Sequence, residues 1–381
     1  MLVSKNFGDI VTFSRASSGW SFSSGGVLVP SAADVPRLDY DPVTLAVRGL
    51  LLERSQTNLC TYSEFPNGVS DAPVRGGTVT AEAINWFGYF TKGLSLGWDG
   101  ATDAYAYKTV ALSPSASYTF SLFVRMDDGN APSFGSATGS DVSNDFSMVV
   151  GSSTIGPNSF GVEALRDGVF RVTGTLTTSA SPGTNLGIVK YRTNSSRTFK
   201  FTGYQIVASA YPGSYMPTLG AQATRSYDSA VITDLSRVGF NLAEGTLYAE
   251  YIVPKLGSTA GALNVNDGTS NYRMAIISNS GNQCGAYVNV GGASFYLIQP
   301  DVLSAGAIAK CALAYRADGF AFSSNGKPAV VGGAGSGVPS VNRLVLGSTN
   351  LPGSEMLNSC LRNVRYIPRR ITNTELQALT A

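Results

Sequence analysis

Residues 117–125 have the sequence SYTFSLFVR, in which apolar and polar side chains alternate. Successive side chains of a β-strand point to opposite faces of its sheet, so a period of two indicates a half-buried strand. One face of this strand would carry Tyr118, Phe120, Leu122 and Val124, and the other Thr119, Ser121 and Arg125. The segment therefore predicts a β-strand that lies against a core.

The same alternation recurs along the chain, at residues 170–173, 199–202, 247–253 and 309–316. Turn-rich segments separate these runs, and Asn325-Gly326 between two apolar runs is a strong hairpin signal because both residues tolerate positive φ. Many short strands with regular turns favour a sandwich or barrel. We predict an all-β fold with two antiparallel β-sandwich (jelly-roll) domains, at residues 61–225 and 226–381.

Two further segments have their own patterns. Residues 1–60 contain only short, broken strands, so we expect them to pack on a neighbour and to form a short N-terminal attachment segment. A chain without residues 1–55 should then stay folded. Near the other end, Thr372 and Glu375 have the spacing of a capping box, which predicts one helix with Leu376 and Leu379 facing a sheet.

Composition excludes several classes of protein. Only 14% of the residues are charged and the formal net charge is +2. No basic tract is present, so we expect no nucleic-acid partner. No apolar run approaches the roughly 18 residues of a membrane span, and we expect no membrane insertion. The first ten residues also lack the apolar core of a secretory signal.

Histidine is absent, which removes Ser-His-Asp and Cys-His catalysis and histidine-metal sites. The four cysteines, Cys60, Cys284, Cys311 and Cys360, are far apart and have no CxxC spacing. We interpret them as buried free thiols, with a Cys284–Cys311 bridge as the alternative. We expect no metal centre and no enzymatic activity.

Three sets of short phrases resemble parts of virion proteins of tailed bacteriophages, in the order in which those proteins carry them. The first set is residues 11–17, 26–28, 36–42, 48–53, 56–59 and 62–64. It resembles the opening module of a family of phage tail fibres, head fibres and spikes. The second, at residues 203–205, 212–218 and 223–228, is similar to the end of a carbohydrate-binding-module-like jelly roll.

The third set, at residues 361–363 and 366–376, resembles the closing strand and helix of concanavalin A-like (laminin G-like) lectin/glucanase domains. The resemblance implies a virion protein assembled in the host cytoplasm that binds host cell-surface polysaccharide during adsorption. It implies other virion proteins as partners of the N-terminal segment, and a homo-oligomer, with a trimer favoured. Residues of that segment that would attach it to the particle are Phe13, Arg15, Arg37, Asp39, Tyr40 and Arg48.

Sugar binding needs aromatic faces that stack on the C–H side of a ring and polar groups that bond its hydroxyls. The sequence offers such groups in turn-flanked regions of the first sandwich, at Trp86, Tyr89, Trp98 and Asp99. The alternative interpretation is that these aromatic residues fill the core or a subunit contact, as large aromatics commonly do.

Three alternatives stay open. Calcium is a candidate ligand, with Asp99, Asp103, Asp127 and Asp128 as oxygen donors, although no EF-hand-like spacing exists. A carboxylate-based polysaccharide depolymerase would need two acids roughly 5–10 Å apart. The candidate acids, Glu163, Glu244, Glu250, Asp267 and Asp318, are scattered. The other alternative is a purely structural capsid or tail component without a ligand.

Overall fold

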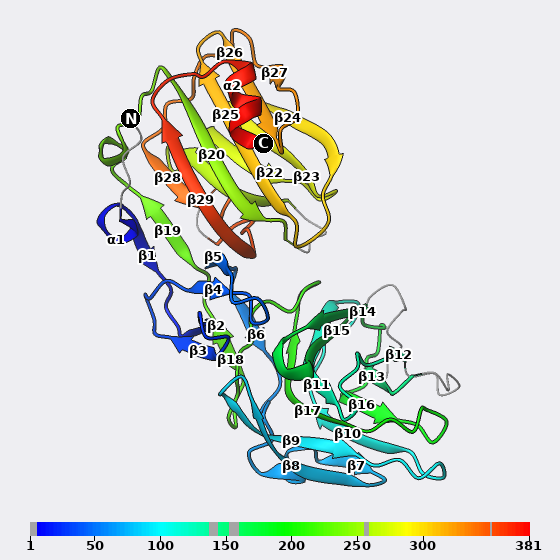
Figure 1. Ribbon diagram of the computed structural model, residues 1–381. Coiled ribbons are helices and arrows are strands. Elements are labelled where there is room, and N and C mark those ends of the chain that lie inside the picture. Colours follow the sequence, from blue (N-terminus) through cyan, green and yellow to red (C-terminus); the bar gives the residue numbers. More distant parts are fainter. Residues whose placement is uncertain (1–5, 137–143, 152–159, 255–258, 351–352) are drawn as a thin grey trace.

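The computed structural model describes residues 6–136, 144–151, 160–254, 259–350 and 353–381. The prediction of an all-β protein with antiparallel sandwiches is confirmed. Figure 1 shows two lobes rich in strands, with the N-terminal strands, which fall within residues 12–58, lying between and alongside them.

The first sandwich pairs a five-stranded sheet, in the order β12-β13-β16-β10-β7, with a six-stranded sheet, β14-β15-β11-β17-β9-β8. Its strands are β7 (Val74–Gly76), β8 (Val79–Trp86), β9 (Phe90–Leu96), β10 (Ala104–Thr109), β11 (Ser117–Met126), β12 (Phe134–Ser136), β13 (Phe146–Val150), β14 (Phe160–Ala164), β15 (Val169–Thr177), β16 (Asn185–Lys190) and β17 (Phe199–Val207).

The alternation predicted for residues 117–125 is confirmed in β11. Its apolar face lies in the core between the two sheets: Tyr118, Phe120, Leu122 and Val124. The other face is buried too, since Thr119, Ser121 and Phe123 are covered by neighbouring segments. A strand at the centre of a sheet can thus be buried on both sides although its sequence alternates.

The second sandwich has two seven-stranded sheets. The α2-side sheet has the order β27-β26-β25-β20-β29-β5-β4, and the opposite sheet β1-β19-β28-β21-β22-β23-β24. The strands are β1 (Thr12–Ser14), β4 (Leu38–Tyr40), β5 (Val47–Leu52), β19 (Ser229–Ile232), β20 (Glu244–Ile252), β21 (Ala260–Asn266), β22 (Tyr272–Ser278), β23 (Gln283–Val290), β24 (Ala293–Val302), β25 (Ile308–Arg316), β26 (Gly319–Ser324), β27 (Val330–Gly332), β28 (Arg343–Leu346) and β29 (Ser359–Ile367).

The N-terminal segment is built into both sandwiches. Strand β1 pairs with β19 and β5 pairs with β29, so each sheet of the second sandwich contains N-terminal residues. The hairpin of β2 (Gly19–Phe22) and β3 (Leu28–Ser31) packs Trp20, Phe22 and Leu28 on the first sandwich. Strand β6 (Gln56–Asn58) pairs with β18 (Ala223–Arg225). The expectation that this segment packs on a neighbour is confirmed.

Within the part of the chain that the structure describes, the helices are few and short. These are α1 (Phe7–Ile10), α2 (Asn373–Thr380) and the 3₁₀ turns η1 (Gly68–Asp71), η3 (Arg166–Gly168) and η4 (Leu235–Val238). The predicted capping box of α2 is confirmed, with Thr372 Oγ1 accepting from the Glu375 N–H. Leu376 is buried against the α2-side sheet, whose outer face α2 covers (Figure 1). At Asn325-Gly326 both residues have positive φ, as the hairpin signal requires.

A buried ion cluster connects the N-terminal segment with the link between the two sandwiches. Its members are Arg15, Arg37, Glu53, Arg225 and Asp228. The four ion pairs have N–O distances of 2.6, 2.8, 3.1 and 3.3 Å. Burial acts to raise the pKa of Glu53, but the charges of Arg225 and Arg37 outweigh it and hold that pKa at about 2. The Glu53 carboxylate therefore stays ionised inside the protein.

The four cysteines are buried free thiols, as predicted. Cys284 and Cys311 lie on facing sheets, with their Sγ atoms 3.3 and 3.9 Å from the Tyr251 hydroxyl. Among the residues that the structure describes, no helix has the length and apolar character needed to cross a bilayer.

Candidate functional site

The aromatic residues predicted to bind sugar do not form one surface. Trp86 is only 2% exposed and packs with Phe87 and Phe90. Tyr89 lies 4.4 Å from the ring of Trp20 and donates a hydrogen bond to Glu64 at 2.5 Å. The hairpin of β2 and β3 covers Trp86, Phe87 and Phe90, because its apolar side chains Trp20, Phe22 and Leu28 leave water by packing there.

Trp98 and Asp99 lie elsewhere, in the turn after β9. The Trp98 side chain is 38% exposed. The Asp99 carboxylate accepts hydrogen bonds from the backbone N–H groups of Ala101 and Thr102, which lower its pKa. This geometry is an Asx turn, in which an aspartate stabilises its own loop.

Of the residues predicted to attach the protein to a particle, Arg15 and Arg37 belong to the buried ion cluster. Asp39 is also buried, and burial raises its pKa to about 6, despite a hydrogen bond from the Phe22 N–H and the charge of Arg48. The side chains of these three residues contact other parts of the same chain. Their role in attachment stays a prediction.

The remaining three attachment candidates are more accessible. Phe13 and Tyr40 are half-buried. The Arg48 side chain is 28% exposed and pairs with Asp41 and Glu163 at 3.1 and 3.3 Å. Within residues 35–47 of the same segment, five apolar side chains stay exposed: Val35, Leu38, Val43, Leu45 and Val47.

The four aspartates considered for calcium lie in two loops, one between β9 and β10 and one after β11, and have protein partners. Asp103 accepts from the Arg192 N–H, and Asp127 from the Thr198 hydroxyl. Asp128 forms two hydrogen bonds with Arg197, both of 2.8 Å, which lower its pKa. Within the described part of the chain, no group of three or more potential metal ligands comes together.

A different surface, on the opposite sheet of the second sandwich, carries polar and aromatic side chains. Alternate residues of β22, β23 and β24 fill the core: Met274, Ile276, Ala286, Val288 and Leu297. The residues between them therefore point away from the core. Five of these form what we call the tyrosine face: Arg273, Tyr287, Asn289, Ser294 and Tyr296.

Strand register arranges this face in two rows. Tyr287 stands opposite Tyr296 in one row, while Arg273, Asn289 and Ser294 follow one another in the next. Members of one row lie on neighbouring strands, about 4.8 Å apart, and the two rows lie two residues apart along each strand, about 6.8 Å. The rows thus place an aromatic strip directly beside a polar strip.

Ring contacts order the aromatic part. The rings of Tyr287 and Tyr296 are 4.8 Å apart with an angle of 55° between them. The guanidinium of Arg273 stacks on Tyr287 at 4.3 Å from the ring centre. Such cation–π contacts restrain both partners. Tyr296 remains 59% exposed, so one ring of the pair is open to solvent.

Hydrogen bonds hold the polar side chains of the tyrosine face in place. Arg273 donates to the Thr349 carbonyl at 2.8 Å, and Asn289 donates to the Tyr287 hydroxyl at 3.3 Å. Burial acts to raise the pKa of Tyr287, but hydrogen bonding with Arg273, Ser294 and Asn289 lowers it overall. A restrained arginine and tyrosine beside an exposed ring can hold a flat, hydroxyl-bearing ligand.

None of the residues predicted to bind sugar belongs to this face, although the sequence contains a signal for it. Tyr287 and Tyr296 are symmetrically placed about Gly291-Gly292, which forms the turn between β23 and β24, and both glycines have positive φ. A hairpin centred there puts the two tyrosines opposite each other. Which face of the hairpin stays open depends on the second sheet.

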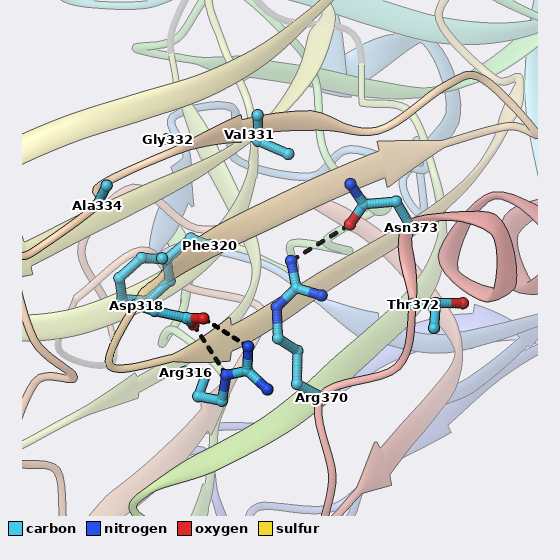
Figure 2. A pocket seen from close by; sticks show the side chains of 10 residues that line it. Arg316, Asp318, Phe320, Val331, Gly332, Ala334, Arg370, Thr372 and Asn373 are labelled. Atoms are coloured by element: carbon cyan, nitrogen blue, oxygen red, sulfur yellow. Dashed lines mark hydrogen bonds and ion pairs between the residues drawn. The ribbon is translucent and has the colours of Figure 1, made fainter.

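Two shallow pockets lie outside this face. One, of about 530 Å³, is lined by residues at the end of the second sandwich near α2. Figure 2 shows Arg316 held by Asp318 there, and Arg370 bonded to Asn373 at the start of the helix. The other, of about 440 Å³, contains Glu82. Each pocket is lined by a single carboxylate, whereas glycoside hydrolysis uses two.

Comparison with known proteins gives only distant likenesses. No protein-family model and no curated protein sequence matches the chain. Among solved structures, the CBM40 domain of the Ruminococcus gnavus IT-sialidase is 17% identical, over 37% of this chain and 84% of that one, with a TM-score of 0.32.

A heptameric SAP-like pentraxin from Limulus polyphemus is 14% identical, over 37% of this chain and 70% of that one, with a TM-score of 0.30. For the NanB sialidase from Streptococcus pneumoniae the identity is 13%, over 39% of this chain and 26% of that one, with a TM-score of 0.31. At these scores the likenesses do not bear on ligand or activity, and the site must be judged by its own geometry.

Proposed function

We propose that this protein is a non-enzymatic carbohydrate-binding protein of a tailed-phage virion, and that the tyrosine face of the second sandwich holds the glycan. The observation that carries the proposal is the arrangement of Arg273, Tyr287 and Tyr296. One tyrosine ring is exposed, the other is restrained by the guanidinium, and polar groups flank both.

The chemistry suits a sugar ring. The exposed Tyr296 ring offers a flat apolar surface for the C–H face of a pyranose. Ser294, exposed in the adjacent row, can exchange hydrogen bonds with hydroxyl groups on its edge, while the buried Asn289 holds the Tyr287 hydroxyl in place. Because the sheet backbone holds these side chains, little conformational entropy is lost on binding.

A single site of this size binds weakly, which fits a protein present in many copies. Repeated copies on a particle raise the overall affinity by ~10²–10⁴ through effective concentration. A trimeric fibre, spike or decoration protein, assembled in the host cytoplasm, would provide such copies. The phrases that resemble phage virion proteins support this part of the proposal.

Attachment to the particle is proposed for the N-terminal segment. Five of its apolar side chains are exposed within residues 35–47: Val35, Leu38, Val43, Leu45 and Val47. Exposed apolar clusters commonly mark protein contacts. These residues are better suited to a partner than Arg15 and Arg37, which are engaged inside the chain.

The glycan site is tested with Tyr296→Ala and a matched control, Trp98→Ala, which removes an exposed aromatic from the first sandwich. Binding to immobilised host polysaccharide is measured for each variant. We expect Tyr296→Ala to weaken binding about tenfold, equivalent to roughly 1.4 kcal/mol, and Trp98→Ala to leave it unchanged. Loss of binding in Trp98→Ala alone would move the site to the first sandwich.

The virion role is tested with Val43→Asp, which places a charge among the exposed apolar side chains of residues 35–47. Particles assembled with the variant are purified and their protein content is measured by mass spectrometry. We expect a folded protein that is depleted from the particles. If wild-type protein is absent from purified particles, the virion proposal fails. A separate incubation of the protein with host polysaccharide that produced new reducing ends would instead reveal a depolymerase.

A further inference from the structure

The polar row of the opposite sheet extends beyond the tyrosine face and contains a second arginine. Strand pairing gives the full row, from β28 to β24, as Arg343, Asn266, Arg273, Asn289 and Ser294. The aromatic row beside it consists of Val345, Asn264, Ala275, Tyr287 and Tyr296. These ten residues include two cations and no carboxylate.

Neither arginine of the row forms an ion pair with another described residue. Arg273 donates to the Thr349 carbonyl, and Arg343 to the side-chain oxygen of Asn342 at 3.2 Å. Both acceptors are uncharged. By contrast, Arg48, Arg197 and Arg362 on other surfaces each pair with at least one carboxylate.

The acids at the margin of the face are engaged locally. Asp267, in the turn between β21 and β22, accepts hydrogen bonds from the backbone N–H and hydroxyl of Thr269. Glu355 accepts from the Thr349 hydroxyl. The row therefore has positive charge that these carboxylates do not pair with, next to an exposed aromatic ring.

We propose that the glycan held by the tyrosine face is acidic, with a sugar oxyanion seated beside Arg273 while its ring lies on Tyr296. This inference rests on the proposed function and specifies its ligand. A guanidinium binds planar oxyanions through two parallel N–H groups and is only weakly hydrated, so it suits a carboxylate or sulfate better than a hydroxyl. Arg343, two strands away, adds to the positive potential that attracts a polyanion, while Asn266 between the two arginines is buried beneath the Asn350 carbonyl.

The test uses pairs of polysaccharides that share a sugar backbone and differ chiefly in charge. Polygalacturonate is compared with its methyl ester, and dextran sulfate with dextran, by retention of the intact protein on each immobilised polymer. We expect one acidic polymer to be retained at least tenfold more strongly than its neutral counterpart. This advantage should shrink as salt rises, since screening weakens exposed charge contacts.

The variant Arg273→Gln should remove most of that preference, so that the acidic polymer is retained no more than about twofold better than its neutral counterpart. Arg365→Gln is the matched control, because Arg365 stacks on Tyr248 in the same way but on the α2-side sheet. Thermal unfolding checks that each variant is folded. If Arg273→Gln does not fold, Arg343→Gln, which should halve the preference or more, takes its place.

The outcomes separate the two proposals. Equal or stronger retention of the neutral polymers, still lost in Tyr296→Ala, would overturn the acidic ligand and leave the glycan site standing. A preference that Arg273→Gln and Arg343→Gln both retain would also overturn it. No retention of any polymer, or of host polysaccharide, would remove the proposed function itself.

Discussion

Two aromatic clusters of this molecule, one in each sandwich, differ in exposure: one is buried by another part of the chain, and the other is partly open to solvent. Trp86, Phe87 and Phe90 lie on the outer side of the first sandwich, where the N-terminal hairpin covers them. Tyr287 and Tyr296 lie on the outer side of the second sandwich, and Tyr296 stays exposed. Both clusters follow tight turns or hairpins and both have the residue types of a sugar platform.

The comparison shows that aromatic content alone does not identify a binding surface. The first cluster is covered by Trp20, Phe22 and Leu28, which lie about 60 residues earlier in the chain. The second has no such covering segment among the described residues, and its arginine, rather than a further apolar side chain, packs on the ring. The presence or absence of a covering segment thus determines which cluster is buried in the core and which can bind a ligand.

The largest effect is expected from Asp228→Ala, in the ion cluster that anchors the covering segment. The substitution leaves Arg15 and Arg37 buried without this partner, and removing one partner of a buried pair costs about 3–5 kcal/mol. Denaturant unfolding measures the loss. A change below about 1 kcal/mol would show that the N-terminal segment is held mainly by its apolar contacts.

A second substitution, Phe90→Ala, tests the first cluster directly. Phe90 is fully buried, and removing such a ring costs about 3–4 kcal/mol through lost contacts and the cavity left behind. We expect lower stability with unchanged glycan affinity of the folded protein. Weaker glycan binding at unchanged stability would instead identify this cluster as the glycan platform.

The smallest effect concerns pH and Asp39, which lies against the β2–β3 hairpin. Its pKa is raised by burial from 3.8 to about 6. Since the folded state binds this proton more tightly, stability should increase as pH falls from above 6 towards 4. The opposing loss from Glu53, whose pKa is about 2 against an ordinary 4.5, begins only near pH 4.5 and continues downwards.

The variant Asp39→Asn isolates that contribution. As the pH is lowered from 7 to 4.5, the free energy of unfolding should rise for the wild-type chain and change less for the variant. Glycan binding over the same range should be unaffected in both, because Asp39 lies on the edge strand of the α2-side sheet. An identical pH profile for the two proteins would contradict the assignment to Asp39.

Local patterns predicted much of the architecture. The alternation in residues 117–125 indicated the correct inward face of β11, and Thr372 with Glu375 marked the correct helix start. In contrast, we expected a chain without residues 1–55 to stay folded. The structure argues against this, because β1, β4 and β5 belong to the sheets of the second sandwich and Arg37 pairs with Asp228.

The candidate site was the least predictable part. The face with Arg273, Tyr287 and Tyr296 depends on pairings between β28, β21, β22, β23 and β24, which include the distant pairing of β21 with β28. Sequence alone is enough to specify β-sandwiches, since side-chain alternation and turns act within a few residues. Which aromatic residues are covered depends on the folded chain, because Trp20 reaches Tyr89 across 69 positions only after folding brings them together.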